Sequence, residues 1–518
     1  MDSMLGIDLG TRYALAACKI NDKVEVLSNR WGLKKTPSVV SWASEGWLAG
    51  EEAARREVAF PEYTYWDMKR HIACTGPIRC GRRTFSPEEL LVPLLSLVRE
   101  DAEATLTRFI TSCVLTVPAS FNFSQRQAVA RAADKAGFEE IKIINEPTAA
   151  AFAYGKEGLS LILDFGAGTV DVSVVEAEQG IWQVLESVGD SCIGGREIDF
   201  LLARMLQKRL SLISKTSADS EALWRYLLGE AENIKVALST CSSFTWLPSF
   251  GICQSSKPIL IRREELERLM RPMLHKVVNI VSELWKKYSP QRLLLVGGSS
   301  RIPLLHSMLE ERVARPDHLN QCPDEAVAIG AALFGASSEK RFLIDVLSQD
   351  LGIRSATGDF VSVLQKGSPL PCKASKRFIS IANGSLDLHI MQGTSEGQFS
   401  TLNQVTIDFL SEKEEVELFF SVDSNGLLAI ELQRKNGERI AIPDITVEEC
   451  TLKENPVPPE IKDLEKRLAR VSIALPSEQQ GRLLSLFSSA RTLSDKSIYG
   501  DAVAILEEMV REMERVSL

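Results

Sequence analysis

Two similar glycine-containing turns, both in the first two thirds of the chain, restrict its fold more than any other feature. The first is Leu5-Gly-Ile-Asp-Leu-Gly-Thr-Arg-Tyr-Ala-Leu-Ala-Ala17, and the second is Leu161-Ile-Leu-Asp-Phe-Gly-Ala-Gly-Thr-Val-Asp171. In each, an apolar strand ends in an aspartate, a glycine turn follows and a second strand returns, which is typical of a hairpin whose backbone N–H groups can approach an anion. One such turn alone is usually an ordinary hairpin. The repeat indicates two related lobes that each offer a phosphate-binding turn to a shared cleft.

A third glycine stretch, Arg292-Leu-Leu-Leu-Val-Gly-Gly-Ser-Ser-Arg-Ile-Pro303, leads from a buried strand to a helix start. None of the three turns has the Gly-Lys-Ser/Thr ending of a P-loop. Around them, apolar periodicity predicts helices at 88–105, 125–136, 146–155, 197–210, 220–239, 264–287 and 324–334, with Ser86 and Ser124 as N-caps. Alternating strands and helices predict layered α/β lobes, the first over about 1–160 and the second over about 161–341.

Composition and charge describe an ordinary globular protein of several domains, because the chain has 518 residues, 45% of them hydrophobic and 25% charged. The net charge of −9 argues against a general nucleic-acid binder. No apolar run reaches the roughly 20 residues of a membrane span, and the start lacks a signal peptide pattern. The ten cysteines are spread irregularly over a long chain, which is typical of reduced thiols rather than of a disulfide framework. We therefore expect a cytoplasmic protein without a membrane or nucleic-acid partner.

The last third of the chain changes character. After a short apolar segment at 342–347, short alternating segments separated by Asn-Gly turns over 348–452 predict a β-sandwich. Beyond Asn455-Pro-Val-Pro-Pro459, residues 453–518 predict a small α-helical bundle, with helices at 460–471, 477–493 and 497–516. The expected order is thus a duplicated α/β domain over 1–341, a linker, a sandwich and a helical tail.

With these pieces in order, the chain resembles the 70-kilodalton heat-shock chaperones (DnaK-like), whose ATPase domain has the actin-like fold. The similar segments are Gly6-Ile-Asp-Leu-Gly-Thr11, Thr116-Val-Pro-Ala-Ser-Phe-Asn122, Ile143-Ile-Asn-Glu-Pro-Thr-Ala-Ala-Ala-Phe-Ala-Tyr-Gly155, Asp164-Phe-Gly-Ala-Gly-Thr-Val-Asp171, Ile193-Gly-Gly195, Leu295-Val-Gly-Gly-Ser-Ser-Arg-Ile-Pro303 and Pro323-Asp-Glu-Ala-Val-Ala-Ile-Gly-Ala-Ala332. The resemblance implies an ATP-hydrolysing stress-response chaperone that assists protein folding by binding unfolded, extended hydrophobic segments. ATP binding and hydrolysis would control peptide affinity allosterically.

The resemblance also implies roles for individual residues. ATP or ADP would be bound with Mg²⁺, and optionally K⁺; Asp8 and Asp171 would hold Mg²⁺ through water, which suits a hard cation. The residues implied in catalysis are Lys69, Glu146, Thr169, Asp171 and Asp8. The nucleotide-binding positions are Gly10, Thr11, Arg12, Tyr13, Gly166, Ala167, Gly168, Thr169, Gly194, Gly195, Glu232, Lys235, Ser239, Gly297, Gly298, Ser299, Arg301 and Asp324.

In the sandwich, the resemblance implies a peptide-binding site lined by Ile353, Ala356, Phe378, Ile381, Leu386 and Leu388. Alternating hydrophobes could equally form the sandwich core, and both interpretations stay open here. Leu343, Ile344, Asp345 and Val346 match the linker that docks on the ATPase in one nucleotide state. The implied partners are polypeptide clients, a J-domain co-chaperone and a nucleotide exchange factor, and we expect a monomer.

Four features depart from the family pattern. Arg12 replaces a second small hydroxyl residue, and Ala167 adds a Cβ where the family has glycine, in a turn whose backbone could require a conformation that glycine prefers. The passage from Lys69 to Ser86 is short, and the helical tail is about half the expected lid, which predicts fast peptide exchange. Arg12 and Ala167 leave an alternative open, a nucleotide-gated regulatory module with weak hydrolysis that serves one dedicated client. A small-molecule kinase on the same fold is disfavoured, because the sandwich would have no role.

Overall fold

The computed structural model describes residues 4–442, except residues 22, 45, 58, 73–76, 82, 191–192, 214–220, 251–252, 255–257, 318–321, 337–341, 348, 356–358, 380–383, 394–398 and 411–414. Residues Met1–Val447 belong to one compact unit and Glu448–Leu518 to another. The second unit, with the three helices predicted for the tail, lies outside the described residues.

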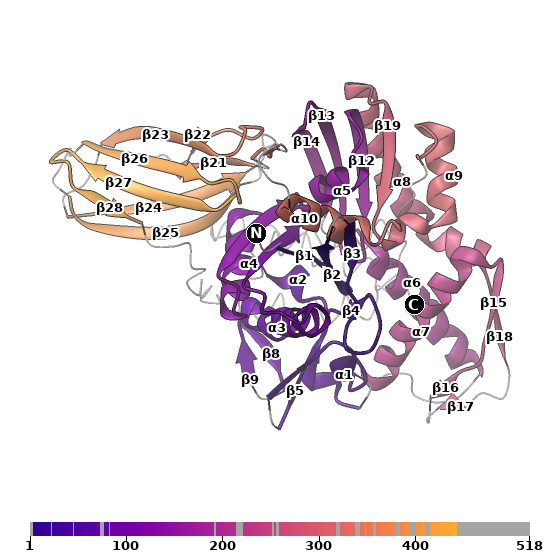
Figure 1. Ribbon diagram of the computed structural model, residues 1–518. Helices are drawn as coiled ribbons and strands as arrows, with labels where there is room; N and C mark the ends of the chain where they lie inside the picture. Colours follow the sequence, from indigo (N-terminus) through magenta and orange to yellow (C-terminus); the bar gives the residue numbers. More distant parts are fainter. Residues whose placement is uncertain are drawn as a thin grey trace, which may run out of the picture. The chain divides into compact units, whose positions relative to one another are not determined.

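Lobe I is built around a mixed sheet with strand order β11-β10-β1-β2-β3, and β4 pairs with β2 (Figure 1). The strands are β1 (Leu5–Leu9), β2 (Tyr13–Ile20), β3 (Lys23–Val26), β4 (Thr36–Pro37), β10 (Ser112–Val117) and β11 (Glu140–Asn145). β1 and β2 form an antiparallel pair, while β10 runs parallel to β1 and β11 parallel to β10. The predicted first hairpin is therefore confirmed.

Lobe II repeats this arrangement in a sheet with the order β19-β12-β13-β14-β20. Its strands are β12 (Gly158–Phe165), β13 (Val170–Glu178), β14 (Ile181–Asp190), β19 (Arg292–Val296) and β20 (Phe342–Ile344). β12, β13 and β14 are antiparallel neighbours, as β1, β2 and β3 are in lobe I, and β19 runs parallel to β12 as β10 does to β1. The predicted duplication is thus present in the topology of the two sheets.

Local signals explain where several helices begin. α3 (Pro87–Leu106) begins after Ser86, which forms the capping box with Glu89. α4 (Phe123–Lys135) begins two residues before its predicted start, because Asn122 rather than Ser124 is the N-cap and exchanges hydrogen bonds with Gln125. α5 (Glu146–Tyr154) ends at Gly155 with φ of 61°, as predicted.

The other helices and small strands complete the two lobes. Lobe II carries α6 (Gly195–Ile213), α7 (Glu221–Thr240), α8 (Arg263–Tyr288), the 3₁₀ turn η2 (Gly298–Arg301), α9 (Pro303–Arg312), α10 (Ala326–Ala336), β15 (Ser243–Trp246), β16 (Ser249–Phe250), β17 (Cys253–Gln254) and β18 (Ile259–Arg262). Lobe I carries β5 (Val40–Ala43), β6 (Gly46–Ala49), β7 (Thr64–Tyr65), β8 (Ile78–Cys80), β9 (Arg83–Phe85), α1 (Glu51–Ala54), η1 (Pro61–Tyr63) and α2 (Met68–His71).

Two short helices join the lobes through small residues. α5 and α10 cross closely enough that a Cβ at Gly330 would collide with the Ala149 backbone. On its other side α10 packs against β1, where a Cβ at Gly6 would meet the Ala332 backbone. Close backbone contact of this kind needs glycine and alanine, which accounts for the Ala-rich sequences of both helices.

The sandwich consists of two four-stranded sheets with the orders β22-β21-β24-β25 and β23-β26-β27-β28 (Figure 1). The strands are β21 (Asp350–Arg354), β22 (Phe360–Leu364), β23 (Cys372–Ile379), β24 (Gly384–Gly393), β25 (Phe399–Leu410), β26 (Glu415–Val422), β27 (Leu428–Arg434) and β28 (Arg439–Ala441). Gly426 and Gly437 take positive φ in the turns after β26 and β27, as the Asn-Gly signals predicted. The predicted β-sandwich is confirmed.

Candidate functional site

The first glycine turn joins β1 to β2 at the end of the lobe I sheet. Asp8 lies near the end of β1, where its carboxylate accepts a hydrogen bond from the Thr116 hydroxyl (3.4 Å). The carbonyl of Gly10 accepts one from the Ser38 hydroxyl at 2.7 Å, and a Cβ on Gly10 would collide with the Tyr13 carbonyl. The turn is therefore held in one shape in which glycine is required.

The second glycine turn joins β12 to β13 and is closed by the Gly166 N–H, which donates to the Thr169 carbonyl (3.0 Å). A Cβ on Gly168 would overlap the Thr11 side chain, so the two turns of the two lobes lie against each other. Ala167 is not among the non-glycine residues with positive φ in the described part of the chain. The expectation of strain at Ala167 is therefore wrong, because the turn does not require a glycine conformation there.

Buried acids surround the place where the turns meet. Asp164 and Asp171, at the facing ends of β12 and β13, are 6% and 1% exposed. Burial raises the pKa of Asp8 and of Asp171 to about 7, and the Glu146 carboxylate adds to both shifts. Burial also raises the pKa of Asp164 well above its usual range.

A buried lysine faces these acids. Lys69, on α2, is 5% exposed and forms an ion pair with Glu146, the first residue of α5. Among the described residues, the Lys69 ammonium is shared by Asp8, Asp164 and Asp171 as well as Glu146, and such a group of carboxylates is the donor chemistry that a hydrated divalent cation fits. No group of three or more His, Cys, Asp or Glu side chains within the described ranges is placed to bind a metal ion directly.

The predicted nucleoside residues gather behind the second turn. Gly195 and Ser299 both donate to the Gly166 carbonyl, through the N–H of Gly195 at 3.0 Å and the hydroxyl of Ser299 at 2.8 Å. Lys235 on α7 donates to the Gly195 carbonyl (3.1 Å) and forms an ion pair with Asp199 (2.7 Å). The start of α6, η2 and α7 therefore converge on one turn, although they are far apart in sequence.

The Arg12 side chain turns toward Glu232, another predicted nucleotide-binding residue. Its guanidinium reaches across to Glu232 on α7, with Nη2 2.6 Å from the carboxylate, and its Cζ lies 3.5 Å from the centre of the Trp66 ring. The Tyr13 hydroxyl donates to the same carboxylate at 3.3 Å. Burial would raise the pKa of Glu232, but Arg12, with further contributions from Lys235 and Arg196, holds that pKa below its usual range.

Asp324 lies close to Arg301, with the guanidinium Nε 3.1 Å from its carboxylate. Gly297, whose φ is 81°, anchors this turn through its N–H to the Pro323 carbonyl (3.3 Å). Asp324 also pairs with Lys35 of lobe I at 2.5 Å.

Gly194 precedes α6 and Gly298 begins η2, whereas the hydroxyl of Ser239, one turn beyond Lys235 on α7, bonds back to its own helix.

The predicted linker is the edge strand of the lobe II sheet. β20 pairs in parallel with β14, which joins Leu343 to Trp182 and Ile344 to Gln183 in register. Asp345 follows, 6% exposed, and its carboxylate accepts hydrogen bonds from the Asn145 side chain (2.5 Å) and the Val346 N–H (2.8 Å). Burial raises the pKa of Asp345, and the nearby Arg126 guanidinium partly offsets the rise.

The residues predicted to line a peptide are divided by the structure. Ile353 and Leu388 are 5% and 3% exposed and belong to the sandwich core, which was the other interpretation of the alternating pattern. Phe378 on β23 is half-buried against that core. Ala356, Ile381 and the side chain of Leu386 lie outside the described residues.

Sequence reasoning missed three participants. Asp164 ends the apolar run that opens the second turn, so its position opposite Asp171 could have been expected from a hairpin. Asp199, one turn into α6, and Lys35 gave no signal, because their partners Lys235 and Asp324 are distant in sequence.

Two duplicated lobes, each with an aspartate beside a glycine turn and the two turns in contact, define an actin-like nucleotide-dependent ATPase, here joined through a docked strand to a β-sandwich. The family model for Hsp70 protein matches residues 4–76 and 77–483. The chain is 32% identical over 494 residues to the "Chaperone protein DnaK" of Mycoplasma mobile, which covers 90% of this chain and 82% of that protein. It is 31% identical over 553 aligned residues to the "Chaperone protein DnaK" of Thermotoga petrophila, and this alignment covers 98% of this chain and 92% of that protein.

The chain therefore belongs to the Hsp70 family. It is an ATP-dependent molecular chaperone and an ATPase. The alternative of a weakly hydrolysing regulatory module gains no support from its two motivating residues, since Arg12 is engaged with Glu232 and Ala167 has an ordinary φ.

Proposed function

We propose that Mg-ATP binds where the two glycine turns meet, with its phosphates on the backbone of Gly10–Thr11 and Gly166–Thr169. The closeness of Gly168 to Thr11 supports this, because an added Cβ at Gly168 would meet the Thr11 side chain, so both turns lie at one point. Asp8 and Asp171 would hold hydrated Mg²⁺, which neutralises phosphate charge when bound. Gly194, Gly195, Ser299, Arg301 and the neighbouring α7 side chains would contact the nucleoside.

In hydrolysis, we assign positioning and charge neutralisation to this chain's own side chains, since phosphoryl transfer needs little else. Lys69 supplies positive charge at a buried position where it is weakly screened. Glu146 holds the Lys69 ammonium in place and is itself fixed at the first turn of α5. Thr169 offers a hydroxyl at the second turn, suited to orienting a water molecule.

The docked linker is the observation that carries the proposed coupling between nucleotide and peptide. β20 extends the same sheet that bears Asp171, and Asp345 bonds to Asn145, the residue just before Glu146. A structural change at the nucleotide would therefore reach the linker by one of two short routes. One runs from Asp171 on β13 through the neighbouring strand β14, and the other from Glu146 through the adjacent Asn145. We infer that the bound nucleotide shifts the equilibrium between the docked and the undocked linker. By linkage, docking of the linker then changes the affinity for both nucleotide and peptide.

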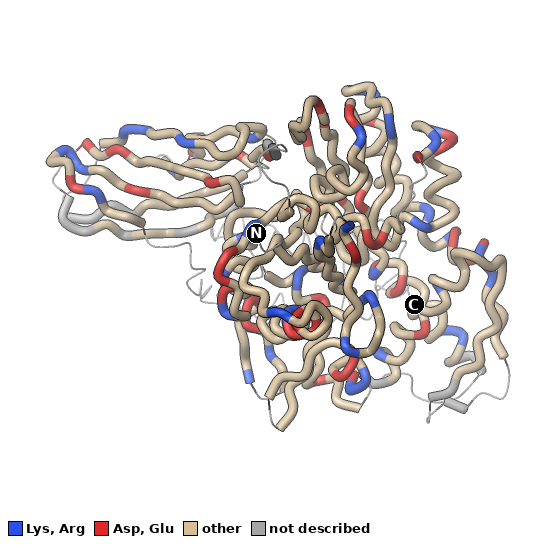
Figure 2. The backbone as a smooth tube through the Cα atoms, viewed as in Figure 1, with Lys and Arg blue, Asp and Glu red and all other residues tan. Residues whose placement is uncertain are grey.

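We further propose that the sandwich binds extended apolar segments of unfolded clients, with Phe378 near the site. A J-domain protein would stimulate hydrolysis and an exchange factor would promote ADP release, in the cytoplasm. No helix within the described part of the chain combines the length and apolar character needed to cross a bilayer. Figure 2 shows basic and acidic residues interspersed along the described backbone.

Calorimetric titration with Mg-ATP tests the proposed nucleotide site. The wild type should bind Mg-ATP, and Asp171→Asn should bind it at least tenfold more weakly in the presence of Mg²⁺. In EDTA the difference in ATP affinity between the two proteins should be smaller, because the proposed role of Asp171 is to hold the ion. Equal affinity of the two proteins in Mg²⁺ would reject the assignment. Single-turnover hydrolysis with an apolar peptide and a J-domain protein should then be faster than without them.

A further inference from the structure

A cavity in lobe I, which we call the lobe I pocket, shares no residue with the proposed nucleotide site. Its volume is about 230 Å³, and it is lined by the loop before β4, by β6, by α1 and by one face of α3. The α3 residues are Pro93, Ser96, Leu97, Glu100 and Asp101, whose helical spacing places them on a single face. The pocket is therefore built by several separate elements of one lobe.

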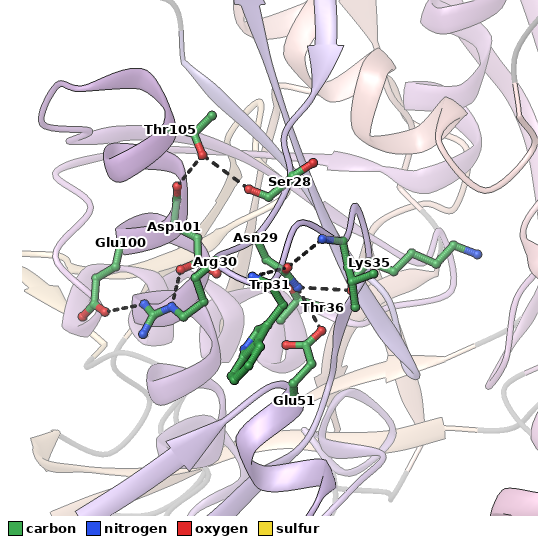
Figure 3. Close-up of polar contacts among 11 residues, drawn as sticks. Ser28, Asn29, Arg30, Trp31, Lys35, Thr36, Glu51, Glu100, Asp101 and Thr105 are labelled. Atoms are coloured by element: carbon green, nitrogen blue, oxygen red, sulfur yellow. Dashed lines mark hydrogen bonds and ion pairs between the residues drawn. The ribbon is translucent and has the colours of Figure 1, made fainter.

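The walls of the lobe I pocket are acidic. Glu51 and Glu52 come from the start of α1, and Glu100 and Asp101 come from α3, whereas the cation among the described lining residues is Arg30. The Arg30 guanidinium donates to Asp101 Oδ1 at 2.6 Å and to the Glu100 carboxylate at 3.1 Å (Figure 3). Four carboxylates thus face one guanidinium, and this excess of negative charge favours a cationic ligand.

Asp101 supplies the observation that points most directly to a ligand. It is 7% exposed and lines the pocket, and its second carboxylate oxygen, Oδ2, is buried without a hydrogen-bond partner among the described residues. Arg30 donates to the other oxygen only. Because a buried acceptor without a donor is unfavourable, an ammonium group bound in the pocket would supply the missing donor.

Two indole rings supply much of the apolar surface of the pocket. Trp31 and Trp47 both line it, and Trp31 is 42% exposed. The Arg55 guanidinium lies over the Trp31 ring, 4.4 Å from its centre, so this ring already interacts with one cation. Trp47 packs edge-on against Trp42 and Phe85, with ring centres 5.1 and 4.7 Å apart, which fixes its position. Indole rings contact both methylene groups and cations favourably.

The loop that presents Trp31 is held by Asn29. The Asn29 Oδ1 accepts hydrogen bonds from the N–H groups of Trp31 and Leu33, both at 3.0 Å. The Asn29 Nδ2 donates to the Glu51 carboxylate at 2.9 Å, which joins the loop to α1 (Figure 3). The pocket is thus formed before a ligand arrives, and a preformed site loses little affinity to ordering.

We propose that the lobe I pocket binds a linear aliphatic polyamine, with one ammonium group at Asp101 and the methylene chain against Trp31 and Trp47. Ammonium groups separated along a chain match carboxylates that come from two elements, α1 and α3. A metal ion fits less well, because within the described ranges no three His, Cys, Asp or Glu side chains converge on one point. The proposal does not depend on the nucleotide site, so either one can fail alone.

Isothermal titration of the full-length protein with spermidine at physiological ionic strength tests this proposal. Spermidine should bind at one site with a dissociation constant on the order of 10 to 100 µM. Asp101→Asn should weaken binding at least about tenfold, because it removes the buried charge, and Trp31→Leu about three- to tenfold, because it removes the ring. Arg30→Gln should strengthen binding about threefold or more, because it removes a competing cation from Asp101.

Matched control variants are Glu88→Gln and Phe109→Leu. Glu88 lies in the first turn of α3 and pairs with Arg131 and Lys135, and Phe109 is 92% exposed beyond the end of that helix. Both controls should bind spermidine with wild-type affinity. If Asp101→Asn does not fold, Trp31→Leu and Arg30→Gln still decide the outcome, because these side chains are about half exposed in the native protein.

Two further ligands test the chemical class. An equal concentration of Mg²⁺ should not displace spermidine, and N-acetyl-lysine amide, which has a single ammonium group, should bind at least about tenfold more weakly. Wild-type affinity in Trp31→Leu, or equal weakening in Glu88→Gln and Asp101→Asn, would overturn the proposal. Tighter binding of N-acetyl-lysine amide than of spermidine would also overturn it, because the pocket would then suit a lysine side chain of a partner protein.

Discussion

Replacing Asp345 by asparagine should release the linker from the lobes. The Asp345 carboxylate is 6% exposed, lies beside the buried Arg126 guanidinium and accepts bonds from Asn145 and Val346. An asparagine amide has one acceptor oxygen where the carboxylate has two, so one of these two donors loses its acceptor, which costs about 1 to 3 kcal/mol at a buried position. We take about 2 to 3 kcal/mol because Asp345 is buried, so water replaces the lost acceptor poorly. Docking should therefore weaken by a factor of about 30 to 150.

Hydrogen exchange of the linker measures this directly. In the Mg-ATP form of the wild type, amides of β20 should be protected by their pairing with β14. In Asp345→Asn the same amides should lose most of that protection, and ATP should no longer change peptide affinity. Asp350→Asn is the matched control, because that carboxylate accepts a bond from Lys366 within the sandwich. Full protection of β20 in Asp345→Asn would refute the reasoning.

Three further predictions concern the lobes. Lys69→Met should slow single-turnover hydrolysis by a factor on the order of 100 or more, because it removes the ammonium that faces Glu146, while Mg-ATP affinity changes little; an unchanged rate would exclude the assigned role. Ala167→Gly should lower the free energy of unfolding by at most about 1 kcal/mol and leave turnover unaltered, whereas a tenfold faster hydrolysis would restore the idea of an impaired turn. Burial raises the pKa of Asp199 to about 6 although Lys235 opposes the shift, so its folded pKa exceeds the unfolded value of about 3.9. The stability that Asp199 contributes is then complete below pH about 4 and is lost as pH rises through about 6. In Asp199→Asn, the midpoint of urea unfolding should therefore depend less on pH over that range. Parallel wild-type and variant profiles would contradict this.

Local patterns predicted much of the fold. The strand–Asp–Gly–strand spacing identified both hairpins, because side-chain alternation and turn chemistry act over a few residues. Ser86 marked the start of α3 for the same reason. The start of α4 was misplaced although Asn122 and Gln125 have the spacing of a capping box, so that signal was available and was passed over.

Contacts between distant residues could not be predicted in the same way. The direction of the Arg12 side chain depends on Glu232, 220 residues away, and on the Trp66 ring that covers it. In the sandwich, alternation places Ile353 and Leu388 on one face of their strands, but it does not say whether that face meets the other sheet or a ligand. Burial decides such questions, and burial is set by the tertiary structure.

The central claim is that the occupied cleft controls the grip of the sandwich through the docked linker. The most direct measurement is the dissociation rate of a fluorescent apolar peptide from one preparation of the protein, in Mg-ADP and then in Mg-ATP. The account predicts at least tenfold faster dissociation in Mg-ATP, and a difference that disappears in Asp345→Asn. Equal rates in the two nucleotides, with binding of both confirmed, would contradict it.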